Sequence, residues 1–154
     1  MLDIRARLRE LGLSLPGVSP PRGVYAPAVR SGSQVYVSGQ IPMAAGGRLL
    51  ATGRVGESVT AEEAYGLSRR CALAALAAAD LAAAPEPVTR VLKVVGYVSC
   101  AEGFLGQHAV VDGAGDLFLA VFGAAGRHVR STVGVARLPL DVPVEIEVVF
   151  AVGD

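Results

Sequence analysis

The chain has 154 residues, with 14 Lys and Arg against 14 Asp and Glu, so its formal net charge is zero. Its length predicts one domain, and the lack of a basic excess argues against nucleic acid as a partner. Hydrophobic residues make up 52% of the sequence, which is enough for a core and for apolar surface buried between subunits.

The cysteines and the apolar runs set further limits. Cys71 and Cys100 lie far apart and neither belongs to a Cys-x-x-Cys pair, so we expect buried free thiols and no disulfide framework or metal site. No N-terminal apolar core precedes a cleavage site, and no apolar run without Gly, Pro or charge has the length of a membrane span. These patterns predict a cytoplasmic protein without a membrane partner.

The first residues combine charge with leucine at helical spacing. Ile4 and Leu8, with another leucine three residues on, predict a short amphipathic helix over residues 2–11. A segment rich in Pro and Gly follows and is typical of an irregular linker. We expect this helix and linker, residues 1–23, to pack on a single domain formed by residues 24–154.

Extended segments come next. Ala26–Arg30 and Gln34–Ser38 flank a Ser-Gly-Ser turn and predict a β-hairpin. Arg48–Leu50 and Gly53–Val55 are short enough to be strands at a sheet edge. The clearest helix follows at Thr60, where the Thr-x-x-Glu pattern predicts a capping box and an Ala-rich run extends to about residue 83 before two prolines.

The second half alternates between the two kinds of element. Val91–Ser99 is rich in valine and predicts a central strand, and Phe104–Phe122 predicts a second helix. Arg130–Ala136 and Val144–Val149 are expected to form a closing hairpin. The order β-β-α-β-α-β-β predicts an α+β fold in which two helices cover one face of a sheet.

Arg130 opens the first of these last two strands, and Glu145 and Glu147 lie on one face of the second. An arginine fork binds a carboxylate through two parallel hydrogen bonds, and a glutamate can hold and activate a water molecule. With the glutamate expected one strand away from the arginine, the pattern predicts a site for a small carboxylate-bearing substrate.

The same stretch resembles a known family. The motifs that carry the resemblance are Tyr25, Val-Ser-Gly-Gln-Ile-Pro at 37–42, Arg-Ser at 130–131, Val-Ala-Arg-Leu-Pro at 135–139 and Val-Glu-Ile-Glu at 144–147. In this order they resemble the YjgF/RidA (reactive imine deaminase) family over residues 24–151. The N-terminal extension and the run 123–131 look like a longer branch of it, often labelled endoribonuclease L-PSP.

The resemblance implies a chorismate mutase-like fold and a homotrimer that buries sheet edges, forms an inner barrel and holds pockets between subunits. It implies that Arg130 binds the substrate carboxylate and that Glu145 holds the water that attacks the imine carbon. It also implies that Ser38 and Gly39 line the pocket, with backbone contact from the glycine, and that Tyr25 closes it.

Three further residues belong to the expected pocket. Ser131 follows the arginine directly. Asp112 stands where relatives often have an asparagine, and Thr132 stands where deaminase-type relatives often have a cysteine. A carboxylate at 112 would disfavour an anionic substrate unless Arg130 neutralises it. These two departures bear on the identity of the substrate.

The function implied by the resemblance is hydrolytic deamination of small 2-imino or enamino acids to 2-oxo acids and ammonia. Such hydrolysis needs positioning and proton transfer, so we expect no cofactor and no metal. Two alternatives stay open: a non-catalytic trimer that binds a small carboxylate, and a ribonuclease or translation inhibitor. For a ribonuclease, His108 and His128 have no partner at a spacing suited to acid–base work.

Overall fold

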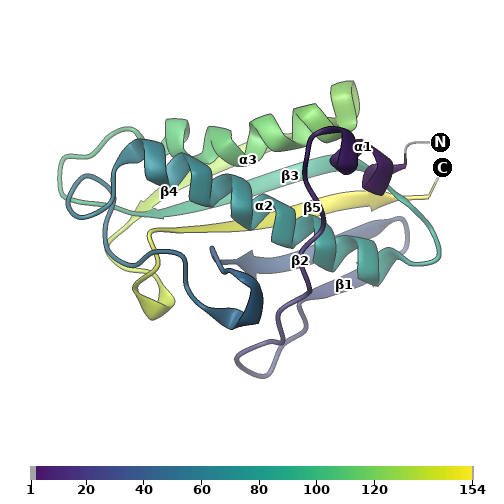
Figure 1. Ribbon diagram of the computed structural model, residues 1–154, viewed down its shortest axis with the longest axis horizontal. Coiled ribbons are helices and arrows are strands. Elements are labelled where there is room, and N and C mark those ends of the chain that lie inside the picture. Colours follow the sequence, from purple (N-terminus) through teal and green to yellow (C-terminus); the bar gives the residue numbers. More distant parts are fainter. Residues whose placement is uncertain (1–2, 154) are drawn as a thin grey trace.

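The computed structural model describes residues 3–153. A five-stranded sheet in the order β1-β2-β5-β3-β4 carries helices on one face (Figure 1). The elements are α1 (Ile4–Glu10), β1 (Ala28–Ser31), β2 (Gln34–Gln40), α2 (Ala61–Ala83), β3 (Val88–Ser99), α3 (Gln107–Phe122), β4 (Val129–Val135) and β5 (Val144–Val152), with short 3-10 turns η1 (Ala45–Gly47), η2 (Gly123–Gly126) and η3 (Pro139–Asp141). The predicted α+β fold, with α2 and α3 on one face, is confirmed.

Helix α2 begins where its capping residues require. The Thr60 side chain accepts a hydrogen bond from the Glu63 amide, and the Glu63 carboxylate accepts one from the Thr60 amide, so the predicted capping box is present. The helix ends at Ala83, just before the two prolines. Its alanine-rich inner face lets it lie close to its neighbours.

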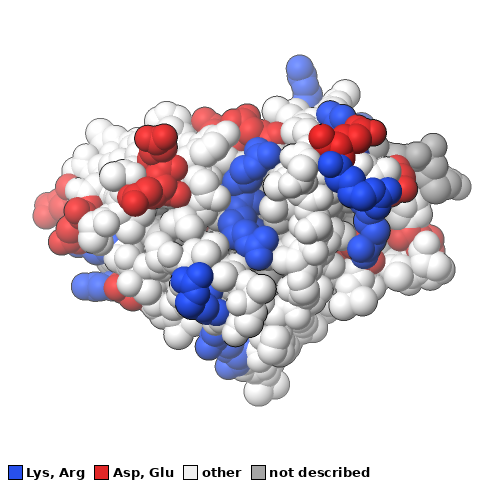
Figure 2. Space-filling view, in the orientation of Figure 1, with Lys and Arg blue, Asp and Glu red and all other residues white. Residues whose placement is uncertain are grey.

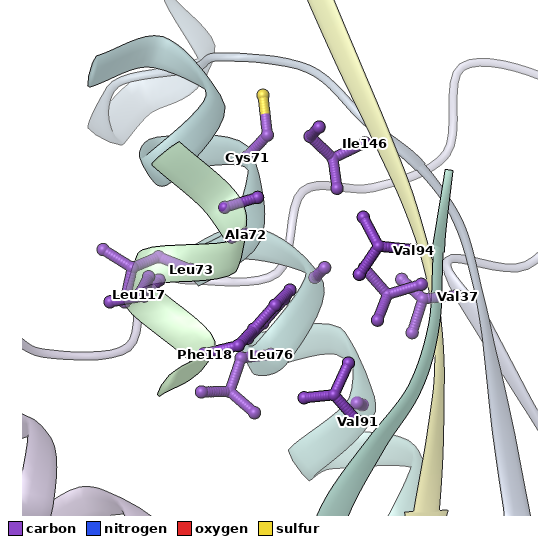
Figure 3. Packing of buried hydrophobic residues seen from close by; sticks show 14 of the residues in the cluster. Val37, Cys71, Ala72, Leu73, Leu76, Val91, Val94, Leu117, Phe118 and Ile146 are labelled. Carbon is purple, nitrogen blue, oxygen red and sulfur yellow. The ribbon is translucent and has the colours of Figure 1, made fainter. Parts of the chain in front are cut away.

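The core lies between the helices and the sheet. Leu76 and Cys71 of α2 and Phe118 of α3 meet Val94 of β3 and Ile146 of β5 (Figure 3). Glycine permits the closest approaches in this region. A Cβ atom at position 96 of β3 would overlap Val111 of α3, and one at position 113 of α3 would overlap the Tyr65 carbonyl oxygen of α2.

The first two strands form the predicted hairpin, with Gly32 at φ 58° in the turn. Strand β3 begins three residues earlier than expected, at Val88, and α3 begins at Gln107 instead of Phe104. The segments 48–50 and 53–55 are not edge strands. They make only isolated bridges, Met43 with Leu49 and Val55 with Val59 and Cys100, because they belong to the long connection between β2 and α2.

The predicted closing hairpin is wrong. Strand β3 lies between β4 and β5: it pairs with β4 in parallel and with β5 in antiparallel orientation. The connection 136–143 passes the end of β3 and contains η3. Within η3, Leu140 and Asp141 have positive φ values of 59° and 58°. This makes β4 an edge strand, with only one neighbour in the sheet.

The N-terminal segment lies against the domain. Ile4 and Leu8 of α1 are buried, and the linker crosses the helix layer to reach β1 with Leu13, Leu15 and Val18 packed on the core (Figure 1). Residues 1 and 2 of the predicted N-terminal segment, and residue 154, lie outside the described residues.

Among the described residues, one helix has the length and hydropathy of a membrane span, although it contains two aspartates and several glycines. It covers α3 and η2, Gln107–Gly126, and 56% of its most apolar window is buried inside the fold. A core helix of this composition passes the same test, and α3 packs on both α2 and the sheet.

Candidate functional site

The first part of the candidate site lies on the sheet face that the helices leave open. In β5, Val144 and Ile146 are fully buried beneath the helices, so the alternating Glu145 and Glu147 point to the opposite face. Tyr97 of β3 lies in register with Glu145 on that face. Two carboxylates and a phenol therefore share one area of the open sheet face.

Gly39 makes room for the Glu145 side chain. The β2–β5 pairing is irregular between Val37 and Gln40, which places the Ser38-Gly39 pair in a β-bulge. A Cβ atom on residue 39 would overlap the Glu145 carboxylate. Only glycine allows this carboxylate to lie directly against the β2 backbone.

The surroundings of Glu145 favour its protonated form. Burial is the main cause that raises the pKa of the Glu145 carboxyl, and the neighbouring Glu147 carboxylate raises it further. The pKa of Tyr97 is raised for the same reasons, by burial first and then by Glu147 and Glu145. A glutamate with a raised pKa holds its proton more strongly than an ordinary glutamate, so it can pass a proton between a bound water and a leaving group.

The second part of the site lies at the edge of the sheet, beside α3. Arg130 of β4 is in register with Val94, a core residue of β3, so its side chain points to the helix face. Its Nη1 donates a hydrogen bond to Asp112 Oδ1 at 2.7 Å, and 26% of the Arg130 side chain is exposed. The guanidinium is thus accessible and paired with a carboxylate from α3.

Within one chain the structure does not bring Arg130 and Glu145 together. They lie on opposite faces of the sheet and on strands that are separated by β3, not adjacent as the predicted hairpin required. Two interstrand spacings alone separate their backbones by roughly 10 Å. The described residues of a single chain therefore do not place both side chains in one pocket.

The remaining predicted site residues divide between these two parts. Ser38 Oγ donates to the Ala26 carbonyl oxygen at 2.7 Å, on the side of Gly39 and Glu145. Tyr25 is 53% exposed in the loop before β1, and its hydroxyl accepts from the Arg22 amide at 3.2 Å. Ser131 and Thr132 lie next to Arg130 in β4, where alternation directs Thr132 to the same face as the arginine.

Tyr97 belongs to the open-face group but was not predicted as a site residue. A polar side chain between the buried valines of this strand indicates a residue on the open sheet face. The sequence does not show that the neighbouring strand is β5, which carries Glu145. His108 lies one turn before Asp112 on α3, and His128 lies two residues before Arg130. His128 Nδ1 lies 2.7 Å from the Gly126 carbonyl oxygen, and its ring packs edge-on against Phe118. Within residues 3–153, no three His, Cys, Asp or Glu residues are grouped to hold a metal ion.

Known proteins resemble the chain along most of its length. Protein TCP17 from Trypanosoma cruzi is 39% identical over 146 residues, which cover 94% of this chain and 91% of that protein. A crystal structure from Shewanella oneidensis MR-1, described as a "putative endoribonuclease", is 31% identical, with a TM-score of 0.90 and coverage of 96% and 98%. The structure of E. coli TdcF with bound serine is 30% identical, with a TM-score of 0.61 and coverage of 89% and 94%.

A family model, described as "YjgF/chorismate mutase-like, putative endoribonuclease", matches residues 5–151. The match covers the whole sheet up to Ala151 of β5 and both helices that pack on it. The resemblance noted in the sequence is thereby confirmed, and the chain belongs to the YjgF/chorismate mutase-like family.

Proposed function

We propose that the protein hydrolyses small 2-imino acids, or the enamino acids in equilibrium with them, to 2-oxo acids and ammonia. The observation that carries this proposal is the Glu145 carboxyl: it is half-buried against the backbone of Gly39, and its pKa is raised. Such a group can take a proton from a water molecule and return it to a leaving amine. The site is proposed to act in the cytoplasm without a cofactor.

The reaction divides into two proton-coupled steps. The substrate carboxylate lies on the Arg130 fork, and Glu145 takes a proton from water as the water oxygen bonds to the imine carbon. The electron pair of the C=N bond moves to nitrogen, which takes the proton from Glu145 and gives the carbinolamine. In the second step the hydroxyl group gives its proton, through Glu145, to the amine, and ammonia leaves as the carbonyl forms.

The proposed site is assembled between subunits of a homotrimer. Arg130 would come from the edge strand β4 of one chain, and Ser38, Gly39 and Glu145 from the open sheet face of its neighbour. The support is the separation of these residues within one chain, together with apolar side chains left exposed on the sheet: Val29, Tyr36, Val129 and Val133. Light scattering tests the assembly, and a monomeric protein would contradict it.

Ammonia release provides the test of the activity. A 2-iminopropionate pool generated in situ by a serine dehydratase is hydrolysed slowly by water alone. We expect the wild-type protein to accelerate ammonia release and the Arg130→Ala variant to lose that acceleration while keeping its fold. An Arg130→Ala variant as active as the wild type would exclude the arginine clamp.

The second candidate is a binding protein without catalysis. E. coli TdcF, at 30% identity, has been crystallised with serine bound, so a member of the family holds a small amino acid. The Arg130 fork could hold the carboxylate of such a ligand here as well. Saturable binding of serine without acceleration of imine hydrolysis would favour this candidate over the enzyme.

The ribonuclease candidate rests on the descriptions of the family and of the Shewanella protein. The charge distribution argues against it. In Figure 2 basic and acidic side chains are interspersed over the helix face, and they form no continuous basic field. RNA binding that weakens steeply as the salt concentration rises would favour the ribonuclease over the deaminase.

A further inference from the structure

The Arg130–Asp112 ion pair joins the proposed carboxylate clamp to a second carboxylate. The two side chains share one hydrogen bond of 2.7 Å, and half of the Asp112 side chain is exposed. A simple anion site gains nothing from a carboxylate beside its arginine, because the bound anion and the carboxylate repel each other. Carboxylate binding by Arg130 alone therefore does not account for an aspartate at position 112.

Asp112 is held in place by its two neighbours in the chain. Val111 packs against Gly96 of β3, and Gly113 lies so close to α2 that a Cβ atom would overlap the Tyr65 carbonyl oxygen. The arginine is held by the parallel pairing of β4 with β3. Both backbones are thus fixed before a ligand binds, as a recognition site requires.

A second carboxylate lies near Asp112. Asp116 lies one turn further along α3, and its carboxylate accepts a hydrogen bond from the Tyr65 hydroxyl at 2.8 Å. This hydrogen bond is the largest cause of the raised pKa of Tyr65; burial adds to it, and the Asp112 charge contributes less, while Arg69 acts in the opposite direction. The exposed oxygen atoms of the Asp112 carboxylate attract an N–H donor and repel an oxygen lone pair.

Arg130 keeps the capacity to bind a ligand. A guanidinium carries five N–H donors in a planar fork, and Asp112 receives one hydrogen bond from Nη1. A carboxylate that binds two of the other donors lies next to Asp112. In the proposed binding mode, the substituent on the carbon adjacent to the carboxylate lies on the side of Asp112; it is nitrogen in a 2-imino acid and oxygen in a 2-oxo acid.

On the basis of the proposed function, we infer that Asp112 is a specificity-determining residue of the same site. It accepts a hydrogen bond from the N–H of a bound 2-imino or 2-amino acid and repels the carbonyl oxygen of a 2-oxo acid. The Arg130–Asp112 pair thereby distinguishes the substrate from the product of the reaction. The product loses its N–H donor as ammonia leaves, so it is released readily and inhibits weakly.

Two three-carbon carboxylates that differ at C2 test the inference by isothermal titration. We use L-alanine, which carries the ammonium group, and pyruvate, which carries the oxygen. The wild type is expected to bind L-alanine more tightly than pyruvate, and Asp112→Asn to lower this ratio of affinities about tenfold, the effect of one charged hydrogen bond. Asp116→Asn, one turn away on the same helix, is the matched comparison and lowers the ratio less than Asp112→Asn does, because the Asp116 carboxylate is already bonded to the Tyr65 hydroxyl.

The outcomes separate the inference from the function on which it rests. A folded Asp112→Asn variant with the wild-type ratio, while Arg130→Ala loses both ligands, overturns the role of Asp112 alone. A wild type that binds neither ligand, or an Arg130→Ala variant that binds both normally, removes the clamp and the inference with it. Asp112→Ser provides a second uncharged variant if the first does not fold.

Discussion

At Glu145, burial and a neighbouring carboxylate act in the same direction. Both raise the pKa of the Glu145 carboxyl in the folded protein above its ordinary value of 4.5. In the folded state this carboxyl therefore keeps its proton to higher pH than in the unfolded chain. Between the two pKa values the folded state binds more protons, and stability falls as the pH rises through this window. The ionised Glu145 carboxylate that the proposed chemistry uses therefore destabilises the folded state.

Glu145→Gln is expected to raise the melting temperature at pH 7, where it removes the ionised carboxyl, and to leave it unchanged at pH 4, below both pKa values. The same variant should lose about 10²- to 10⁴-fold in kcat, the usual contribution of a general base. Thermal melts at both pH values and the ammonia assay measure these effects.

Glu147→Gln is the matched control for that variant. It removes the second carboxylate but keeps Glu145, so activity should persist and the acid limb of the pH–rate profile should move to lower pH. A Glu145→Gln variant that melts below the wild type at pH 7 would contradict the electrostatic account.

Arg130→Lys tests the planar fork apart from its charge. Lysine keeps the positive charge but cannot form two parallel hydrogen bonds to a carboxylate, so kcat/KM should fall about 10- to 100-fold. Arg127→Lys, at an exposed position on the same segment, should keep wild-type kinetics. Equal activity of Arg130→Lys and wild type would show that charge alone is sufficient there.

The sequence could select residues of the candidate site but not their positions in space. Tyr25, Ser38, Gly39, Arg130 and Glu145 were chosen from motifs in the chain. The contact between Gly39 and Glu145 depends on the β2–β5 pairing and its bulge, which no local pattern specifies. Tyr97 was missed for the same reason.

At the scale of elements, the spacing of α2 and α3 depends on one glycine. Gly113→Ala would place a methyl group against the Tyr65 carbonyl oxygen, which cannot move without its helix, so we expect a loss of about 1–3 kcal/mol in the free energy of unfolding. Because Asp112 is the preceding residue, the shift should also disturb the Arg130 pair.

Gly66→Ala is the control for that prediction. Gly66 lies in α2 with no atom within 4 Å of an added Cβ, so alanine should stabilise the helix by up to about 1 kcal/mol. Urea denaturation of the three proteins measures both effects. If Gly113→Ala were as stable as the wild type, the close packing of α2 on α3 would not be needed.

Local patterns predicted the elements well and their pairing less well. The capping box at Thr60 and the β1–β2 hairpin depend on residues close in sequence, and both are present. The sequence also located β4 and β5 to within a few residues, but local patterns contain no information about the partner strand. For that reason the closing hairpin was wrong, and the position of β3 between β4 and β5 emerged only from the structure.

For the whole molecule, the sheet separates the two proposed catalytic groups. Arg130 faces the helices from an edge strand, and Glu145 faces the open side from the central strand β5. Alternation along each strand could be read from the sequence, but the relation between the strands could not. A two-chain site follows from this topology if both groups act on one substrate.

Subunit mixing tests this account most directly. Arg130→Ala and Glu145→Gln chains carrying different tags are coexpressed, and assemblies that contain both are isolated through both tags. In a cyclic trimer, one of the three interfaces then joins an intact Arg130 to an intact Glu145, which predicts ammonia release at about one third of the wild-type rate, although each variant alone is inactive. Mixed assemblies as inactive as their parents, beside an active wild type, would contradict a site shared between two chains.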